Sequence, residues 1–171
     1  EQTSATDLEK IFENKAPGFC YTRVGNPTVT AFENRITKLE GGIASIACAS
    51  GMAALMNAFL NILRSGNEIV SSASLYGGTI DLFTDLEAFG ITTRYVENNN
   101  WEQIEGAINE HTRLVFAETI GNPCLDVTDI EKLAEIAHAH ELPLIVDNTT
   151  STPYLIQVLK HGADIVVNSS S

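Results

Sequence analysis

Short apolar segments alternate with helix-like segments along most of this chain, and this alternation most constrains its fold. Glycine, proline or asparagine marks many of the boundaries between them. The predicted strands cover residues 43–48, 68–71, 92–96, 114–117, 144–146 and 165–167. Strands that alternate with helices at this spacing form a parallel sheet, because each connection crosses a face of the sheet. The sequence therefore predicts one α/β domain, with a mostly parallel sheet and helices on both faces.

Start and stop signals mark the predicted helices. Asn100 with Gln103, and Thr128 with Glu131, have the spacing of capping boxes at helix N-termini. In a capping box, the side chain of each residue accepts the backbone N–H of the other. The remaining predicted helices cover residues 7–14, 27–40, 51–63, 80–89 and the short stretch 152–161.

Composition narrows the range of partners and sites. A net charge of −12 argues against a nucleic-acid partner or an anionic membrane surface. No apolar run reaches the roughly 18 residues of a membrane span, and the first residues lack a signal-peptide pattern. The cysteines, Cys20, Cys48 and Cys124, form no C-x-x-C pair, so free thiols in a reducing cytoplasm and no metal site are expected.

Four loops that follow predicted strands are rich in glycine or polar residues, and ligands bind at that edge of a parallel sheet. Gly51 starts a helix and could bring backbone N–H groups to an anion, or simply follow an ordinary cap. Tyr76 could stack on a flat ligand or be a half-buried loop residue. Asn122 could orient a ligand hydroxyl or serve turn chemistry. Asp147 needs a partner, which could be a cationic ring nitrogen, an arginine or a helix N-terminus.

Known nucleotide-binding fingerprints are missing from these loops. Neither G-x-G-x-x-G nor G-x-x-x-x-G-K-[ST] occurs in the sequence, so dinucleotide and P-loop binding are not supported.

Taken together, the loops resemble the Cys/Met-metabolism family of pyridoxal-phosphate (PLP) enzymes. The matching segments are residues 21–28, 49–52, 76–79, 118–123, 147–149 and 169–171, in the family's order. The resemblance runs in register from Tyr21 to Ser171 and implies the aspartate-aminotransferase (fold type I) large domain.

The resemblance also implies a role for each matching position. The PLP phosphate would be held by Gly51, Met52, Ser169, Ser171 and, from a neighbouring subunit, Tyr21 and Arg23. Tyr76 would stack on the pyridine ring and help proton transfer. Asp147 would pair with the protonated ring nitrogen, and Asn122 would form a hydrogen bond with the ring hydroxyl oxygen. Thr149 belongs to the same cofactor-binding set. Tyr76 and Asp147 are the predicted catalytic residues.

The family motif Ser-x-Thr-Lys ends in the lysine that forms a Schiff base with PLP. Ser169–Ser171 fills its first three places, so the lysine is expected directly after Ser171, in a longer parent protein. Residues 1–26 are then expected to reach the neighbouring subunit, and residues 27–171 to form the N-terminal part of the PLP-binding domain, without the C-terminal half.

Within the family, the segments 117–123 and 147–150 are most similar to O-acetylhomoserine sulfhydrylases. This implies γ-replacement on O-acetyl-L-homoserine by sulfide or a thiol, giving homocysteine and acetate in methionine biosynthesis, in a cytoplasmic homodimer or homotetramer. Cystathionine γ-synthase or γ-lyase is the alternative. Methionine γ-lyases carry a cysteine where this chain has Gly78, which counts against them. A lysine-less fragment that only binds or dimerises is the non-enzyme alternative.

Overall fold

The computed structural model describes residues 4–171, which form two compact units. The first unit contains the described residues up to Lys38 together with Gly42–Ala47, and the second contains Leu39–Gly41 and Cys48–Ser171. Residues 1–3 of the predicted N-terminal segment lie outside the described residues.

The first unit is built on helices. α1 spans Ala5–Phe12, and α2 spans Pro27–Glu40, continuing into the second unit. α2 begins as predicted, because Asn26 Oδ1 accepts the Thr28 N–H at 2.9 Å. It ends before Gly41, whose φ of 71° lies in the left-handed region that favours glycine.

The predicted strand at residues 43–48 is wrong. This segment is irregular, and side chains of α2 provide its hydrogen-bond partners in place of a neighbouring strand. Glu33 Oε1 accepts the Ala47 N–H at 2.9 Å, and the Thr37 and Ser45 hydroxyls are 2.8 Å apart. An apolar run of strand length therefore does not become a strand here, because α2 already satisfies part of its backbone.

The second unit contains a five-stranded sheet in the order β2-β1-β3-β4-β5, with every strand pair parallel. The strands are β1 (Glu68–Ser72), β2 (Thr92–Val96), β3 (Thr112–Glu118), β4 (Leu144–Asp147) and β5 (Ile165–Val167). The chain passes from β1 to β2 on one side and then returns to β3 on the other. The strand order thus reverses between β1 and β3, and this switch point is where ligands bind in open α/β sheets.

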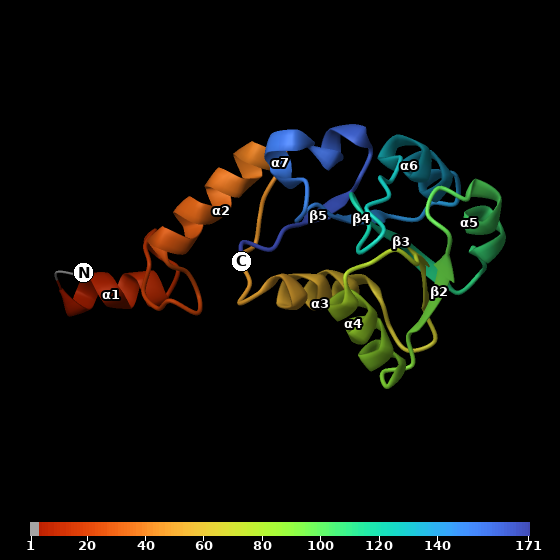
Figure 1. Ribbon diagram of the computed structural model, residues 1–171. Coiled ribbons are helices and arrows are strands. Elements are labelled where there is room, and N and C mark those ends of the chain that lie inside the picture. The colour runs from red at the N-terminus through yellow and green to blue at the C-terminus, as the bar shows by residue number, and fades with distance from the viewer. Residues whose placement is uncertain (1–3) are drawn as a thin grey trace. The chain divides into compact units, whose positions relative to one another are not determined.

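Helices cover both faces of this sheet, as predicted (Figure 1). Those of the second unit are α3 (Gly51–Ile62), α4 (Gly77–Glu87), α5 (Trp101–Ala107), α6 (Ile130–Ala139), α7 (Thr152–Leu155) and the 3-10 helix η1 (Val158–His161). None of the described helices is both long and apolar enough to cross a membrane.

Alternation along β3 shows how the core is divided. Leu114 and Phe116 pack in the cluster that contains α3 and α4, whereas Val115 and Ala117 pack in the cluster that contains α5 and α6. Because both faces are buried, β3 is a continuous apolar run, which made it predictable from sequence.

Both predicted capping boxes are wrong in detail. Asn100 caps α5 by accepting the Gln103 N–H, but Gln103 Oε1 accepts the Glu97 N–H at 2.6 Å instead of returning to Asn100. The cap of α6 is Asp129, and Thr128 donates its hydroxyl to the Glu118 carbonyl at 2.7 Å. Glu97 and Glu118 compete for these side chains from outside each helix, which local spacing could not reveal.

Candidate active site

Three of the predicted site segments follow parallel strands and therefore meet at one edge of the sheet. Tyr76 comes after β1, Asp147 ends β4, and Ser169 comes after β5. β4 and β5 are hydrogen-bonded neighbours, with Asp147 paired to Val167. The carboxyl edge of the sheet thus positions these side chains through strand register.

The start of α3 lies against Ser169. A Cβ atom added at Gly51 would lie 2.9 Å from the Ser169 Cβ, so only glycine allows this approach without a shift. The Ser50 Oγ caps the helix by accepting the Ala53 N–H at 3.1 Å. As first-turn amides, those of Gly51 and Met52 have no acceptor within the helix, and the helix dipole makes this end positive.

Hydroxyl groups gather beside this helix start. The Ser169 and Ser171 Oγ atoms are 2.7 Å apart, and Thr149 Oγ1 accepts the Ser169 N–H at 2.8 Å. Thr149 therefore holds the backbone of Ser169, a contact that the sequence did not specify. Amide and hydroxyl donors at a positive helix end suit an anionic group such as a phosphate.

Asp147 is a carboxylate that could bind a cationic group of a ligand. It is partly buried, its Oδ1 accepts the Thr149 N–H at 2.8 Å, and burial raises its pKa. No arginine, lysine or histidine of the described residues forms an ion pair with it, and the residue before α7 is Ser151. The arginine-pair and helix-cap alternatives are therefore not observed, and a protonated ring nitrogen would suit this carboxylate.

Glu118 is a site residue whose role the sequence did not reveal. It ends β3, is only 7% exposed, and is paired in register with Asp147. Its Oε1 accepts the Tyr76 N–H at 2.9 Å and the Thr79 hydroxyl at 3.3 Å. Burial is the main reason that its pKa rises to about 6, and the nearby Asp147 charge adds to this rise.

Tyr76 lies directly before α4 and is 55% exposed. Its ring lies over Gly78, where an added Cβ would come within 2.5 Å of Tyr76 Cε1. Glu118 fixes the Tyr76 backbone and Gly78 leaves room for its ring, so the ring position depends on both residues.

Asn122 is exposed in the loop after β3, and its peptide bond to Pro123 is cis. The same loop is tied to the segment before Tyr76 by a hydrogen bond between Ser74 Oγ and Asp126 Oδ1. This link connects the loops on the two sides of the switch point.

Tyr21 and Arg23 belong to the first unit, whereas the residues of the sheet edge belong to the second. The Arg23 guanidinium carbon lies 5.1 Å from the centre of the Tyr21 ring, in a turn where the Val24 and Gly25 amides both donate to the Tyr21 carbonyl. The two side chains thus form a cation–π contact within the first unit. Their contact with another subunit stays a prediction.

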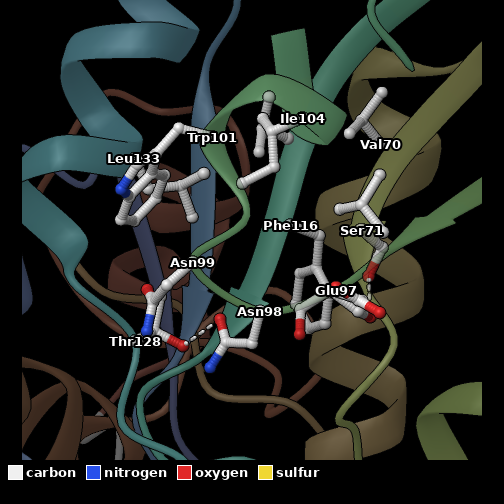
Figure 2. Close-up of a pocket in the computed structure, with 13 residues that line it drawn as sticks. Val70, Ser71, Glu97, Asn98, Asn99, Trp101, Ile104, Phe116, Thr128 and Leu133 are labelled. Carbon is white, nitrogen blue, oxygen red and sulfur yellow. Dashed lines mark hydrogen bonds between the residues drawn. The ribbon is translucent and has the colours of Figure 1, made fainter. Parts of the chain in front are cut away.

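A small cavity elsewhere in the second unit is not this site. It has a volume of about 10 Å³, room for about one water molecule, and lies among residues of β1, β2, β3 and α5. Figure 2 shows Asn98 and Thr128 joined by a hydrogen bond at its border, 3.1 Å in length. None of the predicted cofactor residues lines it.

The residues of the sheet edge fit a ligand with a dianionic group at one end and a cationic ring nitrogen at the other. Donors at Gly51 and Ser169 suit the first group, and Asp147 suits the second. PLP has both features, so its fit rests on these groups as well as on resemblance.

Comparison with known proteins finds relatives that match nearly the whole chain. O-acetyl-L-homoserine sulfhydrylase from Leptospira meyeri is 46% identical over 161 residues, covering 94% of this chain and 36% of that protein. An L-methionine γ-lyase from Fusobacterium nucleatum is 43% identical over 170 residues, covering 98% and 43%. A Campylobacter jejuni structure described as an O-acetylhomoserine (thiol)-lyase, with N'-pyridoxyl-lysine-5'-monophosphate, matches at a TM-score of 0.88 and 36% identity, covering 98% and 42%.

The chain spans less than half the length of each of these proteins. Its parallel sheet and flanking helices have the fold type I architecture that the resemblance implied, so that prediction is confirmed. The family model of Cys/Met metabolism PLP-dependent enzymes matches residues 2–171. The chain belongs to this family of PLP-dependent enzymes.

Proposed function

We propose that the full-length protein is a PLP-dependent enzyme that exchanges the acetate of O-acetyl-L-homoserine for sulfide or a thiol, giving homocysteine when sulfide is used. Two features of the sheet edge support this most. Gly51 and Ser169 form a site suited to an anionic group, and Asp147, at the end of the adjacent strand β4, is a carboxylate without an ion-pair partner among the described residues. When bound, PLP supplies an electron sink for bond changes at the substrate α-carbon.

The site residues of this chain would bind or orient the cofactor. The Gly51 and Met52 amides and the Ser169 and Ser171 hydroxyls would hold the phosphate, with Tyr21 and Arg23 of a second copy adding to it. Asp147 would keep the ring nitrogen protonated, because a carboxylate within reach favours the charged form of its partner.

The remaining groups would act on the ring and the reacting proton. Tyr76 would cover one face of the ring and exclude water, and its hydroxyl could move a proton. Asn122 would donate its amide N–H to the ring hydroxyl oxygen. Glu118 would hold Tyr76 in place through the backbone hydrogen bond of 2.9 Å.

Relatives guide the choice of reaction. The sulfhydrylase from Leptospira meyeri supports O-acetylhomoserine as substrate, and the Fusobacterium γ-lyase supports a second candidate, elimination from methionine. Gly78 favours the first, because methionine γ-lyases carry a cysteine at this position. Cystathionine synthesis or cleavage is the other alternative within the family.

The assembly and the remaining parts of the enzyme are also proposals. We infer that residues 27–171 contribute the N-terminal part of the PLP domain and that the Schiff-base lysine follows Ser171, since the relatives are more than twice as long as their matched regions. We infer a cytoplasmic homodimer or homotetramer in which the first unit contacts another copy.

The test uses the full-length protein with O-acetylhomoserine, O-succinylhomoserine, cystathionine and methionine assayed side by side. Sulfide-dependent homocysteine formation from O-acetylhomoserine should be the fastest reaction. Turnover of cystathionine or methionine alone would refute the proposal. A visible absorbance band that borohydride removes distinguishes the enzyme from a fragment that only binds or dimerises.

A further inference from the structure

Glu40 is a buried carboxylate that the proposed mechanism does not use. Of the fourteen residues of α2, all within the described chain, only Glu40 is buried, and it is 2% exposed. The end of α2 that belongs to the second unit thus buries a carboxylate and no apolar side chain, so the hydrophobic effect does not explain the burial of Glu40.

One oxygen of Glu40 joins the ends of two strands. Glu40 Oε1 accepts hydrogen bonds from Asn168 Nδ2 at 2.7 Å and from Asn148 Nδ2 at 3.4 Å. Asn148 directly follows Asp147 and Asn168 directly precedes Ser169. The oxygen therefore connects the neighbours of the two residues that would hold opposite ends of PLP.

Two further hydrogen bonds fix the position of Glu40 relative to the ends of β4 and β5. Asn148 Nδ2 also donates to the Ile156 carbonyl at 2.9 Å, so both of its N–H groups are used and its amide orientation is set. Gln157 donates to the Leu39 carbonyl, one residue before Glu40. The end of α2 is thus attached to the segment between β4 and β5.

This arrangement costs stability. Among the described residues, Glu40 Oε2, Asn148 Oδ1 and Asn168 Oδ1 are buried without a hydrogen-bond partner, and no described cationic side chain forms an ion pair with Glu40. Buried acceptors and unpaired carboxylates disfavour the folded state. Stability alone therefore does not account for Glu40.

We propose that Glu40 is a positioning residue that sets the spacing between Asp147 and Ser169, and thereby matches the site to the length of PLP. The inference rests on the proposed cofactor role of those two residues. A ligand held at both ends gains affinity only when the two contacts fit together, so a change in spacing penalises PLP more than a ligand that uses one end.

The test compares Glu40→Leu, Glu40→Gln and Thr112→Val in the full-length protein. Thr112 is 1% exposed at the opposite edge of the sheet, where its hydroxyl accepts the Asn109 N–H at 3.0 Å, so its loss is a control for general destabilisation. PLP affinity of the cofactor-free protein, competition by inorganic phosphate and melting temperature are measured for each variant.

Glu40→Leu should weaken PLP binding at least about tenfold, while the inhibition constant of inorganic phosphate stays within about twofold. Glu40→Gln should keep PLP affinity near that of the parent protein without a loss of melting temperature, because it retains an acceptor and adds a donor for an unpartnered amide oxygen. Thr112→Val should change PLP affinity by less than about twofold.

Other outcomes separate the two hypotheses. Unchanged PLP affinity in Glu40→Leu, or equal weakening of PLP and phosphate, would overturn the positioning role. Weakening that only follows the melting temperature, as in the control, would also overturn it. If Glu40→Leu does not fold, Glu40→Gln decides the question. A loss of PLP affinity in that variant would overturn the positioning role. Absence of PLP binding by the parent protein would instead refute the proposed function.

Discussion

At the scale of single residues, two neighbouring carboxylates have different partners. Asp147 and Glu118 are paired in register on β4 and β3, but only Glu118 receives a hydrogen bond from the Tyr76 backbone. The sequence revealed Asp147 because a lone acid after an apolar run needs a partner. Glu118 carries the same local signal, but its partner is 42 residues away, so its role required the fold.

Replacement of Asp147 by asparagine should separate binding from stability. Removal of the charge should weaken PLP binding at least about tenfold, because a buried cation would lose its partner. The melting temperature of the cofactor-free protein should not fall, since burial raises the pKa of Asp147 and thus already disfavours its charge. Cofactor titration and thermal melting check this, and a parallel loss of both would contradict it.

Glu118→Gln should stabilise the cofactor-free protein at neutral pH. The folded-state pKa of Glu118 is about 6 against an ordinary 4.5, so its charge at pH 7.5 costs about 2 kcal/mol. Glutamine removes this cost and can still accept the Tyr76 N–H. The melting temperature of the full-length protein should rise by roughly 2–4 °C at pH 7.5.

This advantage should fade as the pH falls through 6 and vanish below 4.5, where Glu118 is protonated in both the folded and unfolded states. Glu110→Gln is a suitable control, because that side chain is 87% exposed. A stabilisation of Glu118→Gln that does not depend on pH would contradict the raised pKa.

At the scale of elements, the strands of the sheet were predictable and the segment 43–48 was not. The sheet strands are buried on both faces and thus appear as apolar runs, as β3 shows. Ile43 and Ile46 have a similar composition but are 104% and 85% exposed, and α2 supplies the hydrogen-bond partner of Ala47. Apolar composition alone does not distinguish these two environments.

The start of α3 offers a test of the proposed phosphate cradle. Gly51→Ala should weaken PLP and inorganic phosphate binding alike, on the order of tenfold, because the new Cβ would lie 2.9 Å from the Ser169 Cβ and push the helix away. Binding of both ligands to the cofactor-free full-length protein measures the effect.

Gly106→Ala in α5 is the matched control. Nothing lies within 4 Å of an added Cβ there, so it should stabilise the protein by roughly 0.5–1 kcal/mol and leave binding unchanged. Equal binding by the two alanine variants would rule out a close approach of Gly51 to the phosphate.

At the scale of the whole molecule, the described part of the first unit contains no buried apolar side chain. Val24, Ile43 and Ile46 are each at least 78% exposed. Such apolar surface favours association, which supports the proposed contact with a second copy.

The double substitution Ile43→Asp and Ile46→Asp should shift the full-length protein towards smaller assemblies in sedimentation experiments. Charged side chains in an apolar interface cost more than the contacts can recover. Thr92→Asp, at an exposed position of β2, should leave the assembly unchanged. An unchanged mass of the double variant would show that these two residues lie outside any interface.

The link between Glu40 and Asn168 has a consequence for protein synthesis. It joins residues 128 positions apart, and closing so long a loop costs entropy that is recovered only when distant contacts form. A nascent chain must therefore deliver β5 before the carboxylate of α2 finds its amide donors. On this basis, capture of the cofactor would follow the synthesis of β5 and could not begin when only α2 has been made.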